Sequence, residues 1–128
     1  MGILAPVESG ATPKPLVWIG SSKKDLMALP PAAVDVFGYG LYLAQIGKRH
    51  DNSRVLRGFG DASVVELLDS RAGSTYRAVY TVRFAAAIFV LHVFQKKAKH
   101  GVATPKQDLD LIAARLWRAA VLAKELKQ

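Results

Sequence analysis

Alternating apolar and polar positions predict strands in the middle of the chain. From residue 75 to 84 the alternation places Ala78 and Tyr80 on one face of a strand and Arg77 and Val79 on the other. Shorter segments of strand character predict three further strands, at 16–19, 63–69 and 87–94.

The strand at 87–94 is apolar on both faces, which is typical of a strand with neighbours on each side and cover above and below. Gly73 permits a tight turn between the strands at 63–69 and 75–84. We therefore expect an antiparallel meander in which the strand at 87–94 is central.

Helical spacing predicts two helices before the meander. Ser21 or Ser22 can cap a short helix over 23–29, which the two prolines that follow interrupt. A second helix begins at Pro31 and is expected to end at Gly47. Its apolar stripe recurs at steps of three and four residues and comprises Val34, Phe37, Leu41 and Ala44.

A long helix is predicted at the end of the chain. Thr104 is expected to cap it, with Pro105 at the first helical position and Gln107 at the third, as in a capping box. An apolar stripe then continues for about five or six turns and should pack on the sheet. The fold class is α+β, with a small antiparallel sheet, two N-terminal helices and a long C-terminal helix packed on it.

Length and composition indicate one folded domain. The 128 residues are 51% hydrophobic and 22% charged, which suits a single compact unit. Residues 1–14 lack a period and are expected to form a flexible leader before a domain at 15–128. No cysteine is present, which excludes disulfides and thiolate zinc sites and fits a cytoplasmic protein. No apolar stretch is long enough to cross a membrane.

Charge points to a polyanionic partner. Eighteen Lys and Arg against ten Asp and Glu give a formal net charge of +8 and a pI near 10, as is common in nucleic-acid-binding domains. The alternative is that the lysines only keep the protein soluble.

Several kinds of site are disfavoured by the residues present. The three histidines, His50, His92 and His100, and the scattered acids do not resemble a metal site. His92 lies in the most apolar strand, where we expect a hydrogen-bonded core histidine. No glycine-rich phosphate loop is present.

What remains is a set of basic side chains. Arg77 lies inside an otherwise apolar strand, and a lysine cluster follows the strand at 87–94. Guanidinium and ammonium groups suit phosphate. The candidate set for RNA comprises Arg77, Lys96, Lys97, Lys99 and His100, with Arg54, Arg57 and Arg71 from adjoining segments.

The order of several short motifs resembles that of HigB-like, phage-related toxins of the RelE/ParE superfamily, over roughly residues 15 to 118. The motifs are Leu56-Arg57-Gly58-Phe59-Gly60, Val65-Glu66-Leu67-Leu68, Tyr76-Arg77-Ala78-Val79-Tyr80, Leu91-His92-Val93-Phe94-Gln95-Lys96-Lys97 and Thr104-Pro105. The resemblance implies a toxin of a type II toxin–antitoxin pair. Such a toxin is a ribosome-dependent endoribonuclease that cuts mRNA in the ribosomal A site without a metal or cofactor, and its partner is a helix-turn-helix antitoxin.

Residue roles follow from the same resemblance. Arg77 would lie beside the scissile phosphate and Lys97 would take the basic position that closes the last strand, while Lys96 and Lys99 would hold neighbouring phosphates. His100 is a candidate acid or base. The chain departs from RelE-type enzymes at Val64-Val65-Glu66, where those enzymes carry lysines, and it lacks their C-terminal tyrosine.

Two other functions fit the sequence. A ParE-like inhibitor of DNA gyrase would share the fold without RNA-cleaving residues. A non-catalytic module would use the same basic surface to bind RNA or an acidic protein. Catalytic turnover of RNA separates the leading interpretation from both.

Overall fold

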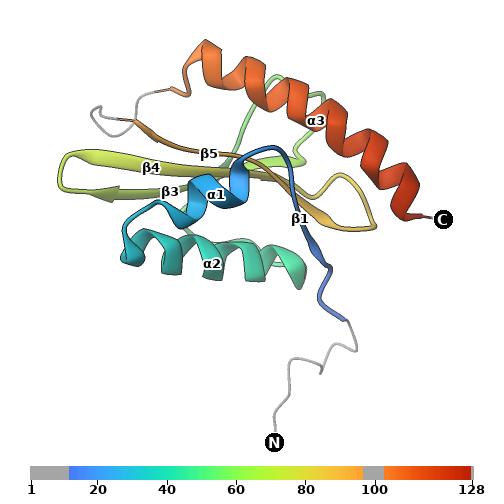
Figure 1. The fold of residues 1–128 in the computed structure, drawn as a ribbon, viewed down its shortest axis with the longest axis horizontal. Coiled ribbons are helices and arrows are strands. Elements are labelled where there is room, and N and C mark those ends of the chain that lie inside the picture. The colour runs from blue at the N-terminus through green and yellow to red at the C-terminus, as the bar shows by residue number, and fades with distance from the viewer. Residues whose placement is uncertain (1–11, 97–102, 128) are drawn as a thin grey trace, which may run out of the picture.

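A mixed sheet with helices on both faces forms the fold (Figure 1). The computed structural model describes residues 12–96 and 103–127. Along the chain the elements are β1 (Leu16–Trp18), α1 (Ser22–Met27), α2 (Pro31–Gln45), β2 (Ser53–Val55), β3 (Val64–Arg71), β4 (Ser74–Thr81), β5 (Ile88–Lys96) and α3 (Lys106–Leu126). The α+β class and the order of the predicted elements are confirmed.

The five strands lie in the order β1-β5-β4-β3-β2. Strands β2 to β5 pair antiparallel, and β5 has a neighbour on each side, as predicted, although the central strand of the five is β4. Two further features differ from the prediction. β1 pairs parallel with β5, so the sheet is mixed, and the basic segment after α2 contributes the short edge strand β2.

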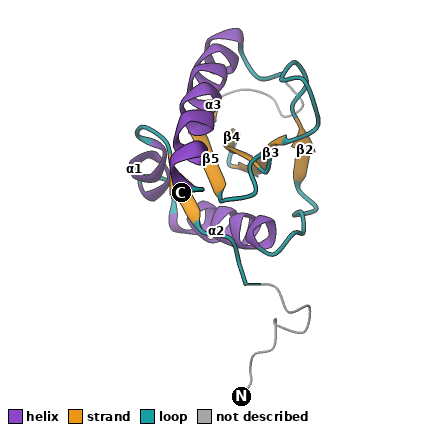
Figure 2. Ribbon diagram, turned by 90° about the vertical axis from the view of Figure 1, so that its right-hand side faces the viewer, coloured by secondary structure: helices purple, strands orange, loops and turns teal. Residues whose placement is uncertain are grey.

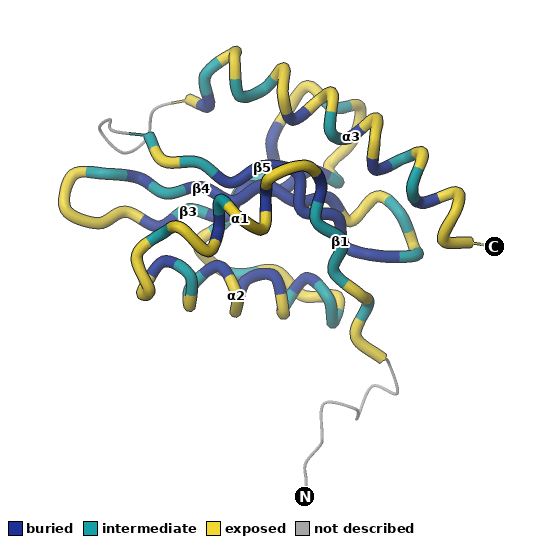
Figure 3. Tube along the Cα trace, in the orientation of Figure 1, coloured by how far each residue is buried: buried dark blue, intermediate teal, exposed yellow. Residues whose placement is uncertain are grey.

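Helix α3 covers one face of the sheet and α2 covers the other, while α1 lies at the β5 edge, as Figure 2 shows end-on. The sheet between them is the most deeply buried part of the chain (Figure 3). The core under α2 includes Phe37, Leu41, Leu67 and Val90, together with the buried ring of Tyr80.

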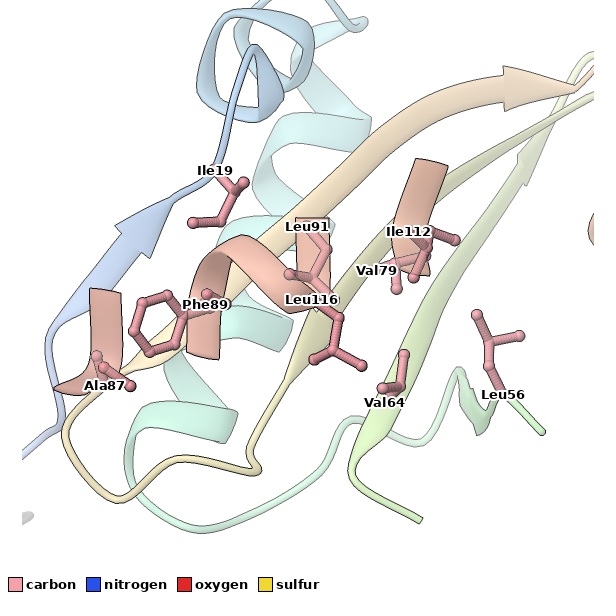
Figure 4. Close-up of a cluster of buried hydrophobic side chains, with 11 residues drawn as sticks. Ile19, Leu56, Val64, Val79, Ala87, Phe89, Leu91, Ile112 and Leu116 are labelled. Carbon is pink, nitrogen blue, oxygen red and sulfur yellow. The ribbon is translucent and has the colours of Figure 1, made fainter. Parts of the chain in front are cut away.

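The α3-facing core is built around Phe89, Leu91, Ile112 and Leu116 (Figure 4). A β-bulge shapes it, because Val79 pairs with His92 while the next residue of β4 pairs with Val90. Leu91 is therefore the extra residue, and its carbonyl oxygen accepts a hydrogen bond from Arg115 Nη1 at 2.9 Å.

Local sequence explains the turns and helix ends. α2 ends in a Schellman motif in which Gly47 has φ 82°, with bonds from Gly47 N to Ala44 O and from Lys48 N to Leu43 O. Ala72 and Gly73 both have positive φ, as a two-residue type I′ hairpin turn requires.

Neither serine at the start of α1 caps it through its side chain. Ser21 Oγ donates to the Asp25 carboxylate at 2.7 Å, and Ser22 Oγ donates to Val90 O at 3.1 Å. The second of these bonds ties α1 to β5. The capping prediction was therefore wrong for both residues.

Candidate functional site

The Glu66 carboxylate is the centre of a buried polar cluster on the α3-facing side of the sheet. Its Oε1 accepts hydrogen bonds from Arg54 Nε at 2.8 Å and Arg77 Nη1 at 3.5 Å, and its Oε2 accepts one from Thr104 Oγ1 at 2.9 Å. Thr104 Oγ1 in turn accepts from Arg77 Nη1 at 3.3 Å. We call Arg54, Glu66, Arg77 and Thr104 the Glu66 cluster.

Strand register brings three members of this cluster together. Arg54 of β2 lies directly opposite Glu66 of β3, and Glu66 lies opposite Val79 of β4. Arg77 is two residues before Val79 and therefore on the same face, diagonal to Glu66. Residues far apart in sequence thus become neighbours through register alone.

Thr104 joins the cluster from the segment before α3. The helix starts one residue later than predicted, with Pro105 as its N-cap and no side-chain cap. The predicted capping box was wrong, because the Thr104 hydroxyl is turned into the protein and bonds the Glu66 carboxylate instead. A buried carboxylate is a stronger acceptor than water for this hydroxyl, and Thr104 is itself buried.

Burial divides the two arginines of the cluster. The side chains of Arg77 and Glu66 are 0% exposed, whereas that of Arg54 is 37% exposed. A buried ion pair adds little net stability but holds its members in one geometry. In this structure Arg54 is therefore the member that can meet a ligand, and Arg77 lies behind it.

Two hollows flank Arg54. One, of about 300 Å3, is lined by Thr104, Ala103 and Leu109, and the other, of about 480 Å3, by Arg49, Ser53, Asp61 and Ala62. We call them the Thr104 hollow and the Arg49 hollow. Both are also lined by the four consecutive residues Arg54, Val55, Leu56 and Arg57, so β2 and the residues after it form the wall between them.

The remaining predicted residues lie apart from this cluster or outside the described residues. Arg71 lies at the β3–β4 hairpin, where its Nε donates to Asp69 at 2.6 Å. Lys96 ends β5 opposite Thr75. Lys97, Lys99 and His100 fall outside the described residues. The structure thus brings together Arg54, Arg57 and Arg77, whereas Arg71 and Lys96 lie at the hairpin end of the sheet.

Glu66 and Thr104 were not predicted as site residues. A signal for Glu66 was present, because it is the one charged residue within the apolar run from Val64 to Leu68 and falls on the same alternation as Arg77 across the hairpin. For Thr104 the sequence favoured a helix cap, in which the hydroxyl accepts a backbone N–H, whereas in the structure this hydroxyl donates to Glu66.

His92 is a buried, hydrogen-bonded residue, as predicted. Its Nε2 lies 2.8 Å from Asp108 Oδ1 in the first turn of α3, and its ring stacks on Phe94 with centroids 4.5 Å apart. This pair fastens the start of α3 to β5 beside the Glu66 cluster.

Electrostatics around the Arg49 hollow are dominated by arginine. Hydrogen bonds from the hydroxyl and backbone N–H of Ser63 and from the side chain of Arg83 lower the pKa of Asp61 to about 2. This carboxylate is therefore ionised near neutral pH and paired with Arg83. On the opposite face of the sheet, burial raises the pKa of Tyr80 to about 12.

Among the described residues no group of three or more His, Cys, Asp or Glu side chains is arranged to hold a metal ion. Of the helices in the described ranges, none has both the length and the apolar character that crossing a membrane requires.

Comparison with known proteins places the site in a family context. Residues 24–117 match the family model described as phage-derived protein Gp49-like (DUF891). The match spans most of the chain and includes β2 to β5, Glu66, Arg77 and Thr104. No curated protein matches the sequence.

Proposed function

The chain belongs to the Gp49-like family of phage-derived proteins, a toxin-like family, and on that premise we propose that it is a growth-inhibiting toxin that cleaves translated mRNA. The observation that carries the proposal is the Glu66 cluster, where a half-buried arginine is held at the rim of two hollows by a buried carboxylate. The formal net charge of +8 suits a polyanionic substrate.

RNA cleavage by attack of a 2′-hydroxyl on the adjacent phosphate depends strongly on positioning and charge stabilisation. Arg54 can supply both, because Glu66 holds its Nε at 2.8 Å, Thr104 Oγ1 accepts from its Nη2 at 3.5 Å, and its side chain lines both hollows. Arg77 acts in this proposal as a positioning residue that holds Glu66 and Thr104. The contact of Arg77 with the scissile phosphate that the resemblance implies stays a prediction, and it requires the cluster to open.

The ribosome dependence, the A-site mRNA and the helix-turn-helix antitoxin implied by the resemblance belong to the same proposal. A basic surface next to apolar side chains supports an acidic or amphipathic protein partner as well as RNA. His100 remains the candidate for proton transfer, since neither Arg54 nor Arg77 can act as a base at neutral pH, and Lys97 remains a candidate for the basic position that closes the last strand.

The test is induced expression followed by mapping of cleavage sites within translated messages. Wild-type protein should arrest growth and cut mRNA in a reconstituted translation reaction, and Arg54→Ala should lower the cleavage rate by about 100-fold or more, the effect of losing one charge-stabilising donor. Arg118→Ala, on the outer side of α3, is the matched control and should cleave like wild type.

Two results would refute RNA cleavage as the activity, and a third would refute the role of the Glu66 cluster in it. Growth arrest with intact messages and a loss of supercoiling by purified gyrase would favour the gyrase inhibitor. RNA binding without any turnover would favour the non-catalytic module. Equal cleavage by wild type and Arg54→Ala would remove the Glu66 cluster from the mechanism.

A further inference from the structure

We propose that single-stranded RNA crosses the β2 edge of the sheet through the Arg49 hollow, with phosphates on Arg57 and Arg49 and a base stacked on Tyr39. This inference deepens the proposed function and rests on it, because it names the path by which the substrate strand leaves the Glu66 cluster. Figure 2 shows β2 at the side of the sheet opposite α1, where no helix lies over its outer edge.

The first support is the supply of unengaged cations along this path. Arg49 and Arg57 are exposed, line the Arg49 hollow and have no ion pair or hydrogen-bonded carboxylate among the described residues. Arg54 stands between them on the shared wall. Exposed arginines without carboxylate partners are suited to bidentate contacts with phosphate.

The second support is the charge balance. The cluster and its two hollows hold four arginines, Arg49, Arg54, Arg57 and Arg77, against the two carboxylates of Glu66 and Asp61. Each of these carboxylates is already bound by arginine. The surplus of two positive charges matches the two exposed arginines Arg49 and Arg57, and it favours an extended polyanion.

The third support is an exposed aromatic ring next to this hollow. Tyr39 on α2 is 57% exposed and meets the His50 ring edge-to-face, with centroids 5.8 Å apart. His50 is held in place, since its Nδ1 accepts the Asn52 N–H at 2.9 Å and its carbonyl accepts Ser53 Oγ at 2.6 Å. Ser53 itself lines the Arg49 hollow, so His50 links the Tyr39 ring to a residue of the hollow.

Arginines followed by an aromatic platform are the arrangement by which proteins bind single strands, because phosphates need cations and every base has a π face. An acidic protein segment would use the arginines but would gain nothing specific from stacking on Tyr39. The combination therefore favours RNA over an acidic protein.

The test measures binding of a fluorescein-labelled 2′-O-methyl oligouridine, which cannot be cleaved, by fluorescence anisotropy. Tyr39→Leu should weaken binding about tenfold and Tyr39→Phe should restore it, because the ring and not the hydroxyl stacks. Arg49→Ala should weaken binding and lower the slope of log K against log salt by about 0.7, the value for one phosphate contact on a single strand.

Matched controls lie on the other side of the molecule. Trp117→Leu removes an aromatic ring that is 77% exposed, and Arg118→Ala removes an exposed arginine. Both should bind like wild type. Equal losses of binding in these controls would show that the basic protein attracts RNA over its whole surface, which would overturn the path. Unchanged binding in Tyr39→Leu would also overturn it.

The outcomes separate this inference from the proposed function. If wild type and Tyr39→Leu both cleave mRNA and bind the oligouridine equally, the path is wrong and the toxin proposal stands. If polyglutamate displaces the oligouridine while Tyr39→Leu binds normally, the surface fits an acidic protein and the path is also refuted. If Tyr39→Leu and Arg49→Ala lose binding but wild type never cleaves RNA, the path is supported and the toxin proposal fails.

Discussion

The α3-facing side of the sheet has two halves that differ in how they are held together. In one half Val64, Phe89 and Leu91 pack against α3 through apolar contacts. In the other half Glu66 and Arg77 form a buried ion pair closed by Thr104. The change occurs within single strands, since Val64 and Glu66 are only two residues apart.

The difference shows what each kind of packing contributes. Apolar contacts are non-directional and stabilise in proportion to the area removed from water. A buried ion pair costs desolvation and returns little net stability, but its hydrogen bonds specify where each group lies. The apolar half accounts for stability, and the polar half fixes the direction of Arg54 at the rim.

Removing the carboxylate should cause the largest change. Glu66→Leu leaves Arg77 buried without its counter-charge and should lower the free energy of unfolding by about 3–5 kcal/mol, measured by urea denaturation. The double variant Glu66→Leu/Arg77→Met should recover most of this loss, because no charge remains buried. If the double variant is less stable than the single one, the comparison between the halves is wrong.

Leu91→Ala tests the apolar half. It should lower the free energy of unfolding by about 2–5 kcal/mol, from lost burial and the cavity left behind, and the loss should be insensitive to salt. Val121→Ala, at a 43% exposed position on α3, is the control and should change stability by less than about 0.5 kcal/mol. A strongly salt-dependent Leu91→Ala effect would contradict an apolar cause.

Thr104→Val removes only the hydroxyl that donates to Glu66 and keeps the shape of the side chain. A hydrogen bond to a charged group contributes about 1.5–3 kcal/mol, so thermal unfolding should show a loss in that range. Thr104→Ser keeps the donor and should retain most of the stability. The two variants behaving alike would mean that the hydroxyl does not matter.

The smallest expected effect concerns the core under α2. A Cβ added to Gly40 would lie 2.7 Å from Leu67 Cδ2, whereas one added to Gly38 meets nothing within 4 Å. Gly40→Ala should therefore destabilise by about 1 kcal/mol, as overpacking outweighs helix propensity. Gly38→Ala should stabilise by about 0.5–1 kcal/mol, as expected at an exposed helix position. Chemical denaturation of both variants measures their free energies of unfolding. A Gly40→Ala variant more stable than Gly38→Ala would contradict the close packing of Gly40 against Leu67.

Periodicity alone could predict most of the fold, because the strands and helices bury continuous stripes. The double-sided apolar run in β5 correctly predicted a strand with neighbours on each side, although β4 is the central strand. The three-residue strand β2 carries too few positions for alternation to be recognised. The parallel direction of β1 depends on which strand it joins, and no local pattern encodes that choice.

The site was harder to predict because it depends on partners across strands. Arg77 was identified as unusual within an apolar strand, but its pairing with Glu66 follows from a register set by the hairpin turn at Ala72 and Gly73. The Thr104 hydroxyl could either cap α3 or bond a buried acceptor, and it bonds the Glu66 carboxylate, whose position depends on the fold.

The parallel pairing of β1 with β5 joins Leu16 to Ile88 and Trp18 to Val90. A nascent chain therefore emerges from the ribosome with its first strand unpartnered until most of the polypeptide has been made. Contacts of such long sequence separation raise the contact order and slow folding. Any truncated product that ends before β5 lacks the strand that joins β1 to β4, so synthesis through β5 is a precondition for this sheet.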